Sequence, residues 1–196
     1  MFKSIAAGTF FGALIFVSNL SPALADDANA LKGNNPGIRC ARAAEAASRS
    51  GTVSAAASLA CQQAVGWAHF VKDEMGPALS NNGVLHLIRG EYQAAVTDFN
   101  AALREGADQV SVLNDRGFAQ AAQHNYQAAA EDYTAALAKA TANQERIYFN
   151  RAMAEEDLGN LKAAYLDYRK AAELAPGWEK AAKELARFKV AHPAMV

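Results

Sequence analysis

Small and aromatic residues follow one another at helical spacing in three separate stretches of the chain. Ala95, Phe99 and Ala102 are four and then three positions apart, which places them on a single stripe of a helix. The same stripe returns twice, as Ala129, Tyr133 and Ala136 and as Ala164, Tyr168 and Ala171. Alanine at these positions would let neighbouring helices approach closely. The pattern therefore predicts three similar helices that pack through the same face.

Each stripe lies in the second half of a longer repeat, and the three repeats occupy residues 76–108, 110–143 and 145–177. The first half of each repeat carries a small residue at the same position, namely Gly83, Gly117 or Ala152. One turn earlier stands a larger apolar or aromatic residue: Leu79, Leu113 or Tyr148. Repeats of this length are typical of helix pairs that bury their apolar faces against one another.

These positions resemble the tetratricopeptide repeat, and the resemblance covers residues 76–176. It implies an all-α fold, a right-handed α-solenoid of stacked helix-turn-helix repeats. The proline that closes a repeat of this family is present only as Pro176. We therefore expect longer or irregular turns at the first two repeat junctions.

Two flanking regions complete the predicted domain organisation. Residues 177–196 contain an amphipathic stretch, with Trp178, Leu185 and Phe188 on one face, which suits a capping helix followed by a tail. Residues 36–75 are expected to form an N-terminal helical hairpin broken at Ser50-Gly51-Thr52. Whether this hairpin is a degenerate repeat stays open.

The first 25 residues have the features of an export signal peptide. Lys3 precedes an uncharged apolar stretch at residues 5–17, and Ala23 and Ala25 form a small-residue cleavage site. The apolar stretch is too short to span a bilayer as a helix, so we expect no membrane insertion after cleavage. Residues 26–35 are polar and are expected to be flexible. We therefore expect a periplasmic or secreted protein.

The two cysteines, Cys40 and Cys61, are equally distant from the expected turn of the hairpin. Antiparallel helices would bring them opposite one another, and an oxidising compartment favours a disulfide between them. A catalytic thiol pair or a metal site is the alternative. Neither has support, because the chain contains no C-x-x-C sequence and no histidine within a few residues of either cysteine.

The composition excludes several other functions. Removal of the leader leaves 18 basic residues against 20 acidic ones, so no excess of positive charge favours nucleic acid. The four histidines share no metal-ligand spacing, and no nucleophile motif or phosphate-binding glycine loop is present. We therefore expect no enzymatic activity, no cofactor and no metal.

One polar pattern also repeats, because an aspartate recurs in the second helix and an arginine in the first. If each aspartate reaches the arginine of the following repeat, Asp98 would pair with Arg116, and Asp132 with Arg151. Such inter-repeat ion pairs would fix the stacking register.

The resemblance also implies where a partner would bind, because the concave groove of this family is lined mainly by the first helix of each repeat. The groove residues carried over to this chain are Val84, Leu87, Ile88, Asn114, Phe118, Arg146, Phe149 and Met153. Their apolar character favours a hydrophobic peptide or an amphipathic helix as the ligand, although any one of them could belong to the core between repeats.

The resulting hypothesis is a protein–protein interaction adaptor that binds a peptide or helix in its groove. The alternative is an architectural subunit of an envelope or homo-oligomeric assembly. The sequence does not identify the partner or the oligomeric state.

Overall fold

The computed structural model describes residues 35–69, 71 and 73–191. The expected leader, residues 26–34 and the C-terminal residues 192–196 lie outside the described part of the chain. The described ranges form nine α-helices and no strand. The helices are α1 (Pro36–Ser50), α2 (Ala55–Ala68), α3 (Met75–Ile88), α4 (Tyr92–Arg104), α5 (Gln109–Ala122), α6 (Tyr126–Leu137), α7 (Gln144–Asp157), α8 (Leu161–Leu174) and α9 (Glu179–Ala191). Among these residues, no helix combines the length and apolar character that crossing a membrane requires.

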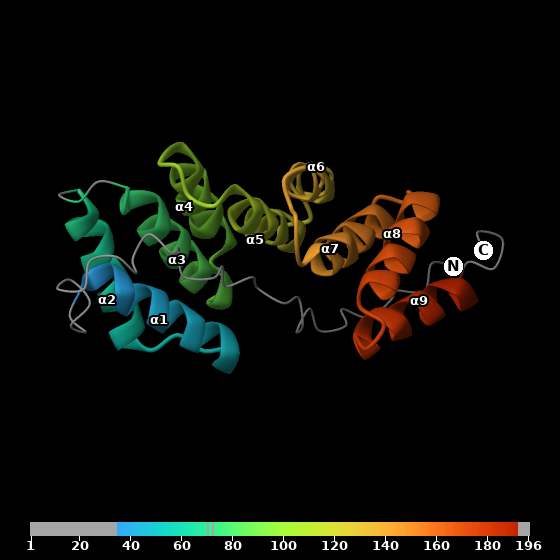
Figure 1. The fold of residues 1–196 in the computed structure, drawn as a ribbon, viewed down its shortest axis with the longest axis horizontal. Helices are drawn as coiled ribbons and strands as arrows, with labels where there is room; N and C mark the ends of the chain where they lie inside the picture. The colour runs from blue at the N-terminus through green and yellow to red at the C-terminus, as the bar shows by residue number, and fades with distance from the viewer. Residues whose placement is uncertain (1–34, 70, 72, 192–196) are drawn as a thin grey trace, which may run out of the picture.

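The helices pack as successive pairs. Helix α3 packs on α4, α5 on α6 and α7 on α8, and neighbouring pairs meet through α4 with α5 and through α6 with α7. In Figure 1, α4 and α6 lie along the upper edge of the stack, whereas α1 and α9 lie along its lower edge. The predicted α-solenoid of helix pairs is confirmed, with a helical hairpin before it and one helix after it.

Local capping explains where several helices begin. The side chains of Asn35, Ser54 and Asp108 accept hydrogen bonds from backbone N–H groups in the first turns of α1, α2 and α5. Pro36 follows the first of these caps at the start of α1, where its missing N–H costs nothing. Gly51 ends α1 in the left-handed conformation, with φ of 69°, and so makes the predicted break in the hairpin.

The junctions between repeats differ from one another. The turn between α6 and α7 spans residues 138–143 and includes Asn143 at a φ of 52°, whereas residues 105–108 and 175–178 form shorter turns. The expected irregular turn is therefore found at the second junction but not at the first.

An aromatic ring fills a notch in each of the first two repeats. A Cβ atom added to Gly83 would lie 2.7 Å from Cε1 of Phe99, and one added to Gly117 would lie 2.8 Å from Cε1 of Tyr133. Glycine is therefore required because the facing ring occupies the space of a side chain. In the third repeat Tyr168 is equally buried, beside Ala152 in the same cluster.

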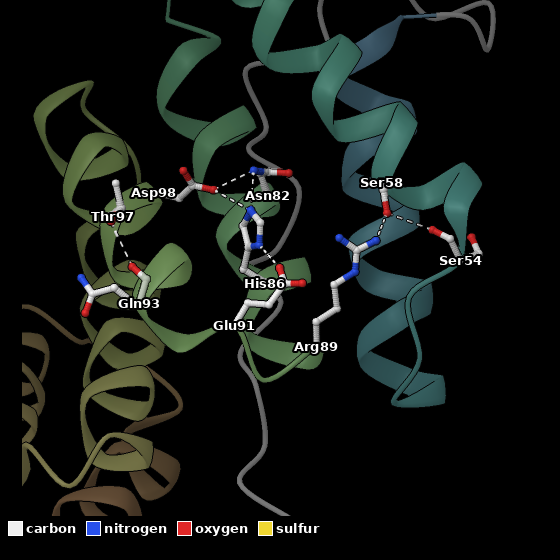
Figure 2. A network of polar contacts seen from close by, with 9 residues as sticks. All are labelled: Ser54, Ser58, Asn82, His86, Arg89, Glu91, Gln93, Thr97 and Asp98. Atoms are coloured by element: carbon white, nitrogen blue, oxygen red, sulfur yellow. Dashed lines mark hydrogen bonds and ion pairs between the residues drawn. The ribbon is translucent and has the colours of Figure 1, made fainter.

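The N-terminal hairpin is built from smaller side chains. Its buried residues are mostly alanines, together with Cys40 and Cys61, whose sulfur atoms lie 2.00 Å apart as a disulfide in the predicted pairing. Both α1 and α2 pack against α3, so the hairpin docks directly on the first repeat. Figure 2 shows one polar contact of this junction, in which Arg89 at the end of α3 donates a hydrogen bond to Ser58 of α2.

Candidate partner-binding surface

The structure divides the eight expected groove residues into two groups. Val84, Leu87, Asn114 and Phe149 are buried, at most 3% exposed. Ile88, Phe118, Arg146 and Met153 are partly exposed. The first group belongs to the interior of the solenoid, and only the second offers surface to a partner. The assignment of the groove as a binding site stays a prediction.

The hairpin explains the burial at the N-terminal end. Val84 and Leu87 lie in one apolar cluster with Cys40 and Ala44 of α1 and with Phe99 of α4. The face of α3 that the family resemblance assigns to a groove is therefore covered within the chain itself.

Helix α9 plays the same role at the C-terminal end. The ring of Phe149 is 4.9 Å from the ring of Trp178, centroid to centroid, and 5.0 Å from Nζ of Lys180. Arg187 of α9 donates two hydrogen bonds to the carboxylate of Glu156 on α7. Helix α9 therefore closes the groove side of the third repeat as well as the end of the core.

A small pocket remains open between these two covered ends, where α5 faces α7. Its volume is about 10 Å³, and it is lined by Phe118, Ala121, Tyr133, Asn150, Met153, Ala154 and Asp157. We call this the α5–α7 pocket. Phe118 and Met153 occupy equivalent positions in successive repeats and are both partly exposed. The pocket is therefore an apolar notch with a carboxylate at its edge.

The floor of the α5–α7 pocket is fixed by polar contacts between repeats. Asn150 of α7 donates a hydrogen bond of 3.1 Å to Oδ1 of Asn114, and Asn114 donates one of 3.2 Å to Asp115. All three side chains are buried, so these contacts are shielded from water and hold α5 and α7 in one register. The contact between Asn150 and Asn114 was not predicted from the sequence.

Electrostatics at the pocket edge favour a cation. Burial raises the pKa of Asp157, and the nearby Glu156 raises it further, while His124 lowers it. A basic group brought next to Asp157 would offset the cost of keeping this carboxylate ionised.

The predicted pairing of the repeated charges is wrong. Arg116 does not pair with Asp98 but with Asp132 of its own repeat, through contacts of 2.8 and 2.5 Å. Arg151 likewise pairs with Asp167 at 2.7 and 2.9 Å. The reason is geometric, because the aspartate 16 positions later lies directly opposite the arginine across each helix pair.

These arginines still connect successive repeats, but through neutral partners. Arg116 also donates a hydrogen bond of 2.6 Å to Asn100 of α4, and Arg151 donates one of 3.0 Å to Thr134 of α6. Each arginine therefore joins the second helix of its own repeat to that of the preceding repeat.

The first repeat has a different set of contacts at the same place. Asn82 donates a hydrogen bond of 2.7 Å to Asp98, and His86 Nε2 lies 3.6 Å from the same carboxylate. The other ring nitrogen of His86 is 2.5 Å from Glu91, as Figure 2 shows. Burial raises the pKa of Asp98, although its contacts with Asn82 and His86 act in the opposite direction.

The described residues contain no group of three or more His, Cys, Asp or Glu side chains that could hold a metal ion. The candidate surface presents apolar side chains, amides and a carboxylate beside a stack of helix pairs. Helix pairs that stack in this way define an α-solenoid repeat protein.

Comparison with known proteins identifies one of the repeats. Residues 145–177 match the family model described as "Tetratricopeptide repeat". The match identifies one tetratricopeptide repeat, at the third of the three predicted repeats. No curated protein matches the sequence.

Two solved structures share the fold. They are described as "MamA 41-end from Desulfovibrio magneticus RS-1" and "MamA RS-1 ArsTM double mutant". Each is 21% identical to this chain, with a TM-score of 0.66, and the match covers 83% of this chain and 88% of that chain. The matched repeat and the stack of helix pairs support a role in protein–protein interaction or as a scaffold.

Proposed function

We propose that this protein is an exported adaptor that binds a peptide or helix of a partner protein at the α5–α7 pocket. The observation that carries the proposal is the position of this pocket. It is an apolar notch on the expected groove side, between one end covered by the hairpin and another covered by α9. A partner would lay an apolar side chain over Phe118 and Met153, which are both partly exposed, and place a basic residue near Asp157.

Export is part of the proposal and has a direct test. The leader at residues 1–25 supports it, and so does the pairing of Cys40 with Cys61, because disulfides persist in oxidising compartments. Cell fractionation followed by N-terminal sequencing is expected to find a protein that begins at Asp26. An intact N-terminus in the cytoplasmic fraction would contradict export.

The binding site is tested by a charge placed in the pocket. Met153→Glu is expected to weaken binding of a partner by about tenfold or more, because a desolvated carboxylate would face apolar surface. Leu166→Glu is the matched control, since Leu166 lies on α8 and is 42% exposed. Both variants are first compared with the wild type by circular dichroism.

Partner recovery from envelope extract is then quantified for the three proteins. Loss with Met153→Glu alone supports the proposal. Equal recovery by all three, or loss with Leu166→Glu alone, would move the binding site away from the α5–α7 pocket.

A further inference from the structure

A second and larger cavity lies at the turn between α5 and α6. Its volume is about 490 Å³, which is within the range of ligand-binding clefts. Its polar lining includes Gln93 of α4, Gln120 and Gln123 at the end of α5, and His124, Tyr126 and Gln127 around the start of α6. We call this the turn cleft. None of the eight expected groove residues lines it.

Amide side chains are concentrated in the turn cleft. Four of the eight glutamines of the chain line it, together with Asn125. Gln123 and Gln127 each donate one N–H within the protein, to Ala119 and Glu131. A carboxamide has two N–H donors and a carbonyl acceptor, so the remaining groups can pair with a ligand that carries both donors and acceptors. No lysine or arginine lines the cleft, and Glu131 does. This charge distribution disfavours phosphates and carboxylates as ligands.

The backbone at the cleft supports a role beyond folding. The turns inside the first and third repeats use Gly90 and Gly159, with φ of 75° and 79°, but the second repeat has His124 at a φ of 63°. A side chain rarely adopts this conformation, and such strain concentrates at functional sites. The imidazole is also held in place, because its Nδ1 is 2.7 Å from the hydroxyl of Tyr126.

One buried acceptor at the cleft lacks a protein donor. Oε1 of Gln120 is buried and accepts no hydrogen bond from the described residues. A buried polar atom without a partner is costly in a folded protein. The cavity is therefore lined both by the histidine in the left-handed conformation and by Gln120.

We propose that the turn cleft binds an extended, uncharged segment of a polypeptide through its main-chain N–H and C=O groups. Main-chain amides match the donor and acceptor pairs of the glutamines. The aliphatic parts of the lining, Val96 and Leu158, accept small side chains. A neutral sugar is less well matched, because the rings of His124 and Tyr126 meet edge to face at 82° and form no flat stacking platform. The turn cleft shares no lining residue with the α5–α7 pocket, although Asp157 of that pocket interacts electrostatically with His124.

The test selects peptides from a displayed library of random 12-residue sequences on the full wild-type chain. Selected peptides are expected to bind about tenfold more weakly to His124→Gly and Gln127→Ala than to the wild type, and equally well to Met153→Glu. N-methylation of main-chain nitrogens in the peptide should also weaken binding about tenfold, because it removes the donors. His124→Gly reproduces the turns at Gly90 and Gly159, so it is expected to fold normally, and Gln127→Ala changes an exposed side chain.

Three results would overturn the proposal. One is that the selected peptides bind both turn-cleft variants as well as the wild type. Another is that no peptide is selected at all. The third is that cellobiose, a neutral disaccharide, perturbs the side-chain amide resonances of Gln93 and Gln127 in an NMR titration while no peptide does.

Discussion

The N-terminal hairpin and the repeats that follow it hold two antiparallel helices together in different ways. Helix pairs of the repeats are joined by a large ring, such as Phe99 or Tyr133, which fills a glycine notch on the facing helix. Among the described residues of the hairpin no aromatic ring is fully buried, and its helices meet through alanines and the Cys40–Cys61 pair. The repeats are therefore stabilised by apolar burial, and the hairpin depends more on its covalent link.

The small side chains of the hairpin also affect which residues of the repeats are exposed. Small side chains let both helices of the hairpin approach α3, so that Val84 and Leu87 become buried. The equivalent positions of the second repeat have no hairpin over them; there Phe118 is partly exposed, whereas the smaller Ala121 is buried. The N-terminal hairpin, which has the smallest buried side chains, therefore covers α3 and leaves the exposed surface to begin at the second repeat.

The largest expected effect comes from a ring of the repeats. Phe99→Ala removes a side chain that is fully buried against Gly83 and is expected to lower the free energy of unfolding by about 3–5 kcal/mol. Urea unfolding followed by circular dichroism measures this change in the free energy of unfolding. The control is Tyr165→Ala, at a partly exposed position of α8, where a smaller loss is expected. If Phe99→Ala lowered the free energy of unfolding no more than Tyr165→Ala does, the ring in the glycine notch would not be the main stabilising contact.

The hairpin is expected to respond to its covalent link instead. The double substitution of Cys40 and Cys61 by alanine removes a constraint across 21 positions and should cost about 3 kcal/mol. Hydrogen exchange should show the loss of protection mainly in α1 and α2 and little change in α7 and α8. Reduction of the wild type should give the same pattern. Loss spread evenly over all helices would argue against a separately stabilised hairpin.

A smaller effect separates the repeats from one another. Asp132→Asn leaves Arg116 partly buried without its charged partner and should lower the free energy of unfolding by about 1.5–3 kcal/mol. Asp98→Asn is the matched change in the first repeat, where the partner Asn82 is neutral and can still donate to an amide oxygen. It should change the free energy of unfolding by less than about 1 kcal/mol. Equal losses would show that the two contacts are equivalent.

The smallest expected effect is the pH dependence of the Asp98 contribution. Burial raises the pKa of Asp98, so the native state holds this proton more tightly than the unfolded chain does. The contribution of Asp98 to stability is therefore greatest in acid and falls as pH rises from about 3.9 through the raised native value. The free energy of unfolding of Asp98→Asn, relative to the wild type, should increase from pH 4 to pH 7. A decrease in this relative free energy of unfolding from pH 4 to pH 7 would contradict the prediction.

The sequence predicted the solenoid because its repeated stripe fixes which face of each helix is buried. Ala95, Phe99 and their equivalents are all buried, as the spacing required. The partners of Arg116 and Arg151 were predicted wrongly, because a repeat pattern shows that charges recur but does not show which neighbouring helix each one faces.

The candidate surface was less predictable for a similar reason. Family positions indicate which residues face the groove, but the cover on Val84 and Phe149 comes from the hairpin and α9, which lie outside the repeat pattern. His124 was visible in the sequence as a departure from Gly90 and Gly159. The sequence alone did not mark His124 as part of a candidate binding site, because that inference depends on its backbone conformation and on the cavity beside it.

Site-specific photo-crosslinking tests most directly whether the open surface lies between two covered ends. A photoreactive phenylalanine analogue is placed at position 153, at position 84 or at position 166, and crosslinked products from envelope extract are compared. The account predicts that a single partner is crosslinked from position 153 and not from position 84, where the side chain is buried under the hairpin, or from position 166 on α8. A partner crosslinked from position 166 but not from position 153 would contradict it.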